Sequence, residues 1–367
     1  MISDVRIGLR AALPRRLALA TAVLAPCSSL PPRAAAASTR RRIVGPDWET
    51  FKSRFVSPAG RVVDPNNSGV SYSESQAWGL LLAEHHADRE AFLRILSWTR
   101  AHLAVRPDSL LAWRYRTESG GLVDDPNNAT DADLYHVWAL FRAARRWPSD
   151  GFQNLATAVA SDIRRRLVRP VNDRVVLLPG AWGFEHAQST VVNPSYYVFP
   201  ALDALNIALP DPIWARLGAE GERLLLGAQF GRWALPPDWV SIARSDGRIS
   251  ILQGRGERFS YDAIRVPLHL VWSRRLYSPV VAATAAFWTD AAQPHLPAWT
   301  VLTSDAISPY AAGPGIRAIA SLVTTATSGP RGALPPPASE PSNLYHDALA
   351  LLAQVAALES GLVRPQA

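Results

Sequence analysis

Hydrophobic positions along the chain recur mainly at helical spacing, and strand-like alternation is scarce from Trp48 onward. Between Phe92 and Leu103 the apolar residues stand three and four positions apart, which is the one-sided stripe of an amphipathic helix. The segment from Leu134 to Trp147 is apolar around most of its circumference, which predicts an inner helix. The pattern predicts helices at 48–56, 73–86, 88–103, 130–147, 150–168, 194–207, 211–229, 261–275, 278–292, 309–325 and 342–359.

Ten to twelve helices without a sheet favour a helical toroid or a solenoid. No repeat of fixed period is visible, so the toroid is the better prediction. A chain of 367 residues with 48% hydrophobic and 19% charged residues can bury a large core, as one big domain or two ordinary ones. The Pro- and Ser-rich segment 328–342 is predicted to be a loose connection.

Polar residues gather where several predicted helices begin. The candidate N-caps are Ser73, Thr130, Asn193 and Ser260. Ser73 fits a capping box with Gln76, and Asn193 precedes a proline at the first helical position. One carboxylate near a helix start is usually structural, because it complements the helix dipole. Four polar starts on otherwise apolar helices indicate a cleft at one end of the toroid.

Positive charge is concentrated at the N-terminus. Residues 1–42 contain eight arginines and one acid, Asp4, which accounts for the whole formal net charge of +7. The remaining residues therefore sum to zero. A nucleic-acid-binding domain carries its basic residues on its folded surface. The charge distribution thus excludes a nucleic-acid partner.

The first 37 residues have the order of an export signal. Arginines precede an apolar run at 17–25, and four alanines at 34–37 offer a small-residue cleavage site. The alternative is a disordered leader rich in Ala and Arg. The only cysteine, Cys27, stands in a context close to a lipoprotein signal except for Pro26, so cleavage and lipidation are both left open.

Beyond the leader, no stretch approaches the roughly 20 apolar residues that a membrane-spanning helix needs. We therefore expect a mature chain without a transmembrane helix, located in the periplasm or secreted. Cleavage after Ala37 would leave no cysteine, and hence no disulfide and no cysteine-ligated metal.

Three segments place acids beside aromatic residues. They are 71–79 (S-Y-S-E-S-Q-A-W-G), 128–133 (N-A-T-D-A-D) and 259–267 (F-S-Y-D-A-I-R-V-P). Glycosidic hydrolysis needs one carboxylic acid to protonate the leaving oxygen and a second carboxylate to activate water or attack carbon. Aromatic faces offer platforms for sugar rings. The clusters therefore favour a carbohydrate enzyme, and we expect no metal or cofactor.

In this order, the three segments resemble the S-E-G-Q, A-S-D-G/A-D and Y-D-A-x-R-V-P signatures of glycoside hydrolase family 8. Further matches stand at 51–52, 60–65, 88–89, 110–113, 177–180, 193–196 and 237–240. The pattern is particularly similar to the endo-β-1,4-glucanases that accompany bacterial cellulose synthases. The resemblance covers 48–275 firmly and the remainder loosely. It implies one catalytic domain at 43–367, an all-α (α/α)6 toroid of about 11–12 helices.

The resemblance also implies roles for individual side chains. Glu74 matches the general acid, Asp262 the general base, and Asp131 the residue that shapes the sugar-distorting −1 subsite. The implied substrate-binding residues are Trp113, Tyr196, Tyr261 and Arg265. Tyr196 and Arg265 match residues that hold the base and its water, whereas the other two match contacts lining the cleft.

The inverting mechanism places two physical demands on this pair of acids. Glu74 must stay protonated near neutral pH, so burial and the charge of Asp131 must raise its pKa against the opposing effect of a helix start. The carboxyl groups of Glu74 and Asp262 must also lie about 6.5–9.5 Å apart to admit a water molecule.

Three departures from the family pattern concern substrate preference and rate more than reaction class. Ser75 replaces a glycine beside the acid, Tyr115 replaces a tryptophan, and His136 with Val137 replaces an Ile/Met-Ala pair. The leading hypothesis is an exported endoglucanase that acts on β-1,4-glucan during cellulose synthesis, with the synthase machinery as a possible partner. The alternatives are a family 8 enzyme acting on xylan or chitosan, and a weakly active cellulose-binding assembly factor.

Overall fold

The computed structural model describes residues 46–363, apart from 118–119 and 329–341. The predicted leader with Cys27 and most of the predicted connection at 328–342 lie outside these described residues. Residues 42–367 form one compact unit. The described α-helices are α1 (Pro46–Phe55), α2 (Ser73–His85), α3 (Arg89–His102), α4 (Thr130–Arg146), α5 (Asp150–Leu167), α6 (Phe199–Ala208), α7 (Ile213–Gly227), α8 (Arg265–Trp272), α9 (Pro279–Thr289), α10 (Pro314–Ser328) and α11 (Leu344–Glu359).

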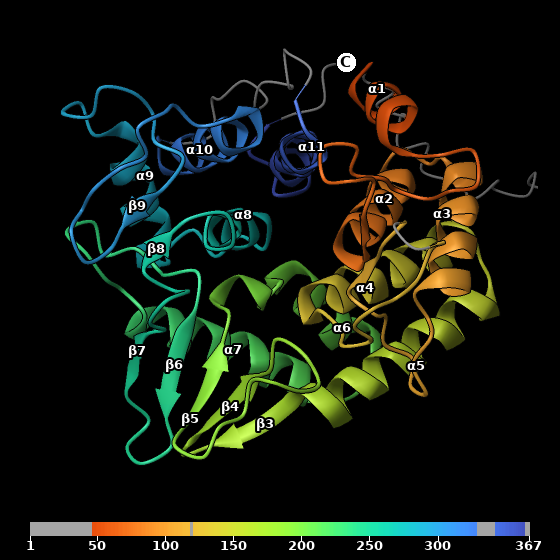
Figure 1. The fold of residues 1–367 in the computed structure, drawn as a ribbon, viewed down its shortest axis with the longest axis horizontal. Coiled ribbons are helices and arrows are strands. Elements are labelled where there is room, and N and C mark those ends of the chain that lie inside the picture. Colours follow the sequence, from red (N-terminus) through yellow and green to blue (C-terminus); the bar gives the residue numbers. More distant parts are fainter. Residues whose placement is uncertain (1–45, 118–119, 329–341, 364–367) are drawn as a thin grey trace, which may run out of the picture. The chain divides into compact units, whose positions relative to one another are not determined.

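Within this unit the helices form two layers. In the inner layer, α2 packs on α4, α4 on α6, α6 on α8, α8 on α11, and α11 returns to α2, which closes the ring (Figure 1). Around it, α1 packs on α11, α3 on α2, α5 on α4, α7 on α6, and both α9 and α10 on α8. The prediction of an all-α toroid is confirmed.

Burial distinguishes the two layers. All eight residues of α8 are buried, and burial extends around most of α2 and α4. By contrast, the outer α5 buries one stripe that runs from Phe152 to Leu167. A helix that is apolar on all sides belongs in an interior, whereas a one-sided stripe belongs on a surface. The sequence pattern therefore predicted the inner position of α4 correctly.

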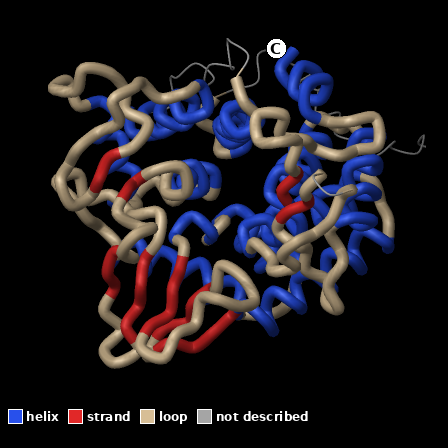
Figure 2. The backbone as a smooth tube through the Cα atoms, in the orientation of Figure 1, coloured by secondary structure: helices blue, strands red, loops and turns tan. Residues whose placement is uncertain are grey.

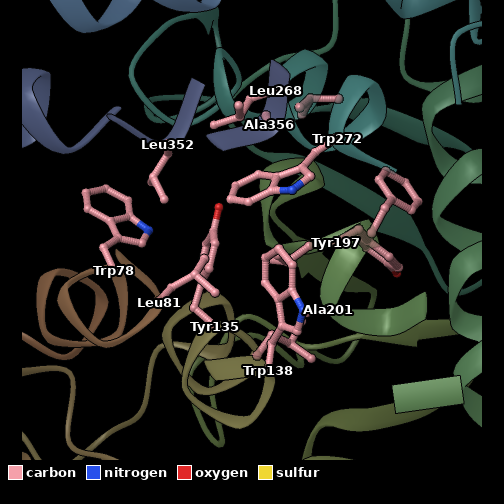
Figure 3. Close-up of a cluster of buried hydrophobic side chains, with 14 of the residues drawn as sticks. Trp78, Leu81, Tyr135, Trp138, Tyr197, Ala201, Leu268, Trp272, Leu352 and Ala356 are labelled. Carbon is pink, nitrogen blue, oxygen red and sulfur yellow. The ribbon is translucent and has the colours of Figure 1, made fainter. Parts of the chain in front are cut away.

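Large aromatic side chains pack where the inner helices meet. Figure 3 shows Trp78 from α2, Tyr135 and Trp138 from α4, and Trp272 from α8 facing one another. The rings of Trp138 and Trp272 meet edge to face, with centroids 4.9 Å apart. Such a pair contributes about 0.5–1.5 kcal/mol beyond the area it buries. The interior of the ring is a packed core beneath the site described below.

Short strands join the helices, and the prediction of helices without a sheet was wrong there. The antiparallel pairs are β1 (Ser71–Tyr72) with β2 (Arg114–Tyr115), β3 (Val168–Val171) with β4 (Arg174–Leu177), and β8 (Arg258–Phe259) with β9 (Thr300–Val301). A three-stranded sheet has the order β5 (Ser189–Val192), β6 (Val240–Ala243), β7 (Ile249–Ile251). Figure 2 shows β3 to β7 gathered together. Strands of two to four residues are too short to display the alternation from which strands are predicted.

The structure contradicts three of the four predicted N-caps, namely Ser73, Thr130 and Ser260. Ser73 and Thr130 are the first residues of α2 and α4, so the caps are the residues before them. Gln76 makes no capping box; its amide accepts from the Val62 N–H and donates to Thr99 Oγ1 at 2.7 Å. Buried tertiary partners therefore outcompeted the local capping interaction.

The other two predicted helix starts, at Asn193 and Ser260, differ in outcome. Asn193 caps the short 3-10 helix η1 (Pro194–Tyr196), as predicted, and α6 begins separately at Phe199. Ser260 is not the N-cap of the next helix, because α8 begins at Arg265 and its N-cap is Ile264. Asp262 consequently lies in the turn that precedes α8.

Among the described residues, none of the helices has both the length and the apolar character needed to cross a bilayer.

Candidate active site

The N-terminal ends of four inner helices open into one pocket. Glu74 comes from the first turn of α2, Asp131 from that of α4, Arg265 from the start of α8 and Tyr345 from that of α11. The lining residues are Asp64, Tyr72, Ser73, Glu74, Ser75, Trp78, Trp113, Ala129, Asp131, Tyr196, Asp262, Arg265, Leu344 and Tyr345. The polar helix starts thus meet, as the sequence indicated, at one end of the ring.

Arg265 joins the acids of this pocket. Its Nη1 donates to Asp131 Oδ2 at 2.6 Å and to Glu74 Oε1, and its Nη2 donates to Asp262 Oδ1 at 2.6 Å. The guanidinium is only 3% exposed. One buried cation cannot neutralise three ionised carboxylates, and an unpaired charge is costly to bury. The cluster therefore favours keeping a proton on one of the acids.

The surroundings of Glu74 favour its protonated form. Burial raises the pKa of Glu74 well above the usual range, and Arg265 opposes this rise. The charge of Asp131 and a hydrogen bond with its carboxyl group raise the pKa further. The Glu74 side chain is nevertheless 24% exposed. Its surroundings therefore favour the protonated acid, and the carboxyl group can be reached from the pocket.

The surroundings of Asp262 are different. Burial raises its pKa above the ordinary value, while Arg265 and a hydrogen bond from Trp239 lower it. The Trp239 indole N–H donates to Asp262 Oδ2 at 3.0 Å, so both carboxylate oxygens have a donor. Donors to the ionised form stabilise it. Asp262 is thus better placed than Glu74 to hold a negative charge.

The turn that carries Asp262 is held by Asp238. Its Oδ1 accepts from the backbone N–H groups of Ser260, at 3.0 Å, and Ala263, at 2.8 Å. Burial, together with the nearby charge of Asp262, raises the pKa of Asp238 to about 8. Asp238 and Trp239 therefore act together, one on the backbone of the turn and the other on its carboxylate.

Aromatic side chains form the walls of the pocket. The rings of Tyr72 and Trp113 stack with centroids 6.0 Å apart, and the Arg114 guanidinium lies 4.3 Å from the Trp113 ring. The Trp113 indole N–H donates to Asp125 Oδ2 at 2.9 Å. Because these contacts fix the orientation of Trp113, it can present a preorganised face to a flat ligand ring.

Tyr196 lies against the charged cluster. The Arg265 guanidinium is 5.7 Å from its ring, and Trp239 is 5.9 Å away. Burial and the charge of Asp131 raise the pKa of Tyr196 well above its usual value. The phenol therefore remains a neutral hydrogen-bond donor at any ordinary pH.

The structure brings six of the seven predicted site residues into the pocket lining, and Tyr261 is the exception. Its side chain is 41% exposed and its ring lies 5.9 Å from that of Tyr345. The Tyr345 hydroxyl donates to the Tyr261 backbone carbonyl. Tyr261 therefore stands beside the pocket, next to one of its walls.

Sequence reasoning missed several residues of the site. Tyr345 and Trp78 line the pocket, and Ser195 accepts from Arg265 Nη2 at 3.1 Å. Trp239 lies in the stretch 237–240 that matches the family pattern, and the sequence assigned it no role. Its position just after a proline-rich segment offered no local sign of a contact with Asp262. In the structure Asn343 caps α11, with its side chain accepting from the His346 N–H, and this capping residue is the signal that could have placed Tyr345 at a helix start.

The departures from the family pattern leave the acids accessible. The Ser75 hydroxyl turns back to the backbone of Tyr72, donating to its carbonyl at 2.9 Å. Tyr115 packs edge to face on Trp98 and is not among the lining residues. His136 is buried in α4, and burial lowers its pKa to about 4. Local contacts thus accommodate each of these departures from the family pattern.

Several known proteins are similar to this chain in sequence and in fold. A "Probable endoglucanase" of Novacetimonas hansenii is 38% identical over 316 residues, which cover 86% of this chain and 91% of that protein. An "Endoglucanase" of Cellulomonas uda is 33% identical over 275 residues, covering 75% of this chain and 76% of that one. The solved endo-β-1,4-glucanase CMCax of Acetobacter xylinum superposes with a TM-score of 0.78 at 37% identity, covering 86% of this chain and 98% of that chain.

The family described as "Glycosyl hydrolases family 8" matches residues 27–357. The match includes the α2, α4 and α8 segments that supply the clustered acids and Arg265. This agreement confirms the resemblance read from the three motifs. With both the sequence match and the superposition spanning most of its length, the chain belongs to glycosyl hydrolase family 8.

Proposed function

We propose that the protein is an exported, inverting endo-β-1,4-glucanase. The observation that carries the proposal is the Glu74–Asp262 pair, which shares one pocket and one arginine. Burial raises the pKa of Glu74 well above its usual range, whereas hydrogen bonds from Arg265 and Trp239 limit the rise in the pKa of Asp262. Two carboxyl groups whose surroundings push their pKa values apart are the arrangement by which acid and base roles are divided. The endoglucanase names of the relatives support β-1,4-glucan as the substrate.

In the proposed reaction, Glu74 transfers its proton to the glycosidic oxygen as the bond to the anomeric carbon breaks. A water molecule attacks that carbon from the opposite face, and Asp262 accepts the proton which the water loses. The products are a new reducing end with inverted anomeric configuration, a non-reducing end that carries the freed 4-hydroxyl, an ionised Glu74 and a protonated Asp262. Exchange of one proton with solvent restores the starting state.

Three further residues assist in this proposal. Asp131, held by Arg265, shapes the subsite in which the sugar ring is distorted, and Trp113 supplies a stacking face. Arg265 orients the carboxylate of Asp262. The mechanism requires the Glu74 and Asp262 carboxyl groups to stand about 6.5–9.5 Å apart when substrate and water are bound.

For the biological role, we propose that residues 1–37 direct export and that the enzyme trims β-1,4-glucan during bacterial cellulose synthesis. The motif similarity to synthase-associated endoglucanases and the order of charged, apolar and small residues in the leader support this. A family 8 enzyme on xylan or chitosan, and a weakly active cellulose-binding factor, are the competing functions.

The test measures reducing-end release and viscosity with carboxymethyl cellulose, xylan and chitosan. An endoglucanase lowers the viscosity of carboxymethyl cellulose early, because internal cuts shorten the chains faster than new ends accumulate. We expect Glu74→Gln and Asp262→Asn each to lower kcat by about 10²- to 10⁴-fold, the usual contribution of a general acid or base.

Asp173→Asn is the matched control, since Asp173 pairs with Arg223 on the surface and is remote from the lining residues. It should retain wild-type activity. Faster hydrolysis of xylan or chitosan than of carboxymethyl cellulose would contradict the proposal that β-1,4-glucan is the substrate. Binding of cellulose without any release of ends would favour the assembly factor, and full activity in both acid variants would remove the site assignment.

A further inference from the structure

Beside the catalytic pocket stands a second group of aromatic side chains, which we call the aromatic row: Tyr261, Tyr310 and Trp299. Tyr261 is 41% exposed and Tyr310 is 49% exposed. The hydroxyl groups of the two tyrosines lie 3.4 Å apart, and the Trp299 indole N–H donates to the Tyr310 hydroxyl at 2.9 Å. Their polar atoms thus satisfy one another along the row.

The row is continuous with the pocket. Tyr345 lines the pocket, and its hydroxyl donates to the backbone carbonyl of Tyr261, the first member of the row. Their rings lie 5.9 Å apart. A ligand chain leaving the pocket on the side of Tyr345 would therefore meet Tyr261 next, and Tyr310 and Trp299 after it.

Tyr310 and Trp299 belong to the segment between α9 and α10, and that segment is held by its own hydrogen bonds. The Ser308 hydroxyl donates to the Tyr310 carbonyl at 2.6 Å and accepts from the Ala298 N–H at 2.9 Å. The Ser308 N–H donates to the Trp299 carbonyl at 3.0 Å. The Arg258 guanidinium lies 4.2 Å from the centroid of the Trp299 ring. The two aromatic residues are therefore preorganised, which lowers the entropic cost of binding.

We propose that the aromatic row is an accessory glucan-binding surface, which takes the part of a β-1,4-glucan chain that extends beyond the catalytic pocket. Its occupant has alternating apolar faces and hydroxyl rims, as a chain of pyranose rings does, and the row offers ring faces interspersed with phenol and indole edges. This inference rests on the proposed endoglucanase function. It assigns Tyr310 and Trp299 a role in engaging long substrates.

The test compares kcat/KM for a long substrate, carboxymethyl cellulose, with that for a short one, cellotetraose. Tyr310→Ala should lower the ratio of long over short by about tenfold, which corresponds to about 1.4 kcal/mol. Tyr310→Phe should keep the ratio close to that of the wild type, because it retains the ring face. Tyr277→Ala is the matched control, since Tyr277 is a fully exposed tyrosine outside the row and should leave the ratio unchanged.

A second measurement uses the full-length Glu74→Gln protein and follows tryptophan fluorescence as cellohexaose is added. Weaker binding after a further Tyr310→Ala change would support the row. An unchanged ratio and unchanged binding in folded Tyr310→Ala would overturn it, and so would an equal loss in Tyr310→Phe, which would mean that the hydroxyl network is structural. Inactivity of the wild type on every glucan would instead sink the proposed function, so the two failures are distinguishable.

Discussion

At the scale of single residues, the proposed acid and base roles depend on which donors reach each carboxylate. Glu74 shares Arg265 with two other acids, and burial favours its protonated form. Asp262 accepts a hydrogen bond from Arg265 on one carboxylate oxygen and one from Trp239 on the other. Activity should therefore fall at acidic pH when Asp262 becomes protonated, and at alkaline pH when Glu74 loses its proton. Because burial raises both pKa values, the whole bell-shaped profile lies higher than free carboxyl groups would place it.

Trp239→Phe tests the contribution of the indole donor. The phenyl ring retains an aromatic face toward Phe184 but cannot donate to Asp262. The ionised form loses a hydrogen bond, so the pKa of Asp262 rises and the acidic limb of kcat/KM against pH moves upward. A hydrogen bond to a charged group is worth about 1.5–3 kcal/mol, so we expect a displacement of about one to two pH units. An acidic limb that stays in place, or moves to lower pH, would show that Trp239 does not stabilise the base.

At the scale of helices, the two ends of the inner ring differ in character. The N-termini of α2, α4, α8 and α11 face the pocket, whereas their last turns are joined by buried ion pairs. Arg142 of α4 donates to Glu84 of α2 and, through Nη1 at 2.9 Å and Nη2 at 2.7 Å, to Glu359 of α11. The Trp272 indole of α8 also donates to Glu359, at 2.9 Å. Burial of these charges is stabilising only while the partners remain paired.

Arg142→Met removes the cation that joins Glu84 to Glu359, while Arg146 still pairs with Glu84 and His85 still contacts Glu359. Because each carboxylate keeps a partner, we expect the free energy of unfolding in denaturant to fall by about 3 kcal/mol. Arg223→Met is the control, because Arg223 pairs with Asp173 on the surface, and its unfolding curve should coincide with that of the wild type. A loss no larger than that of the control would show that the network contributes little to stability.

At the scale of the whole molecule, charge and fold occupy different parts of the chain. Residues 1–42 carry the entire formal net charge of +7, whereas the buried core that the structure describes begins at Trp48. Ring closure brings α11 back against α2, so the catalytic unit depends on contacts between the two ends of that unit. The leader is expected to serve export and not catalysis.

Deletion of residues 1–42 should therefore leave specific activity on carboxymethyl cellulose unchanged. The isoelectric point should move from about 10.0 toward neutrality, because the remaining charges balance. Isoelectric focusing and activity measured on the same preparation check both outcomes, with the full-length protein for comparison. A truncated protein that is insoluble or inactive would assign the first 42 residues a part in folding.

Several features were predictable from sequence because their causes are local. Helical periodicity separated the largely buried α4 from the one-sided α3, and the three acid-and-aromatic segments placed Glu74, Asp131 and Asp262 at or just before helix starts. The order of those motifs also indicated the family and, with it, the toroid. The short strands escaped prediction, since two to four residues are too few to establish a period.

The contacts between the site residues depend on the tertiary fold. Arg265 contacts Glu74 and Asp131, which precede it by 191 and 134 positions, and local spacing says nothing about such pairs. The same holds for Trp239 against Asp262 and for Tyr345 at the edge of the pocket. The pKa of each acid depends on burial and on neighbours from other helices, and both exist only once the ring has closed. The residue types and their helices thus follow from the sequence, whereas the proposed division of acid and base roles depends on contacts that the fold creates.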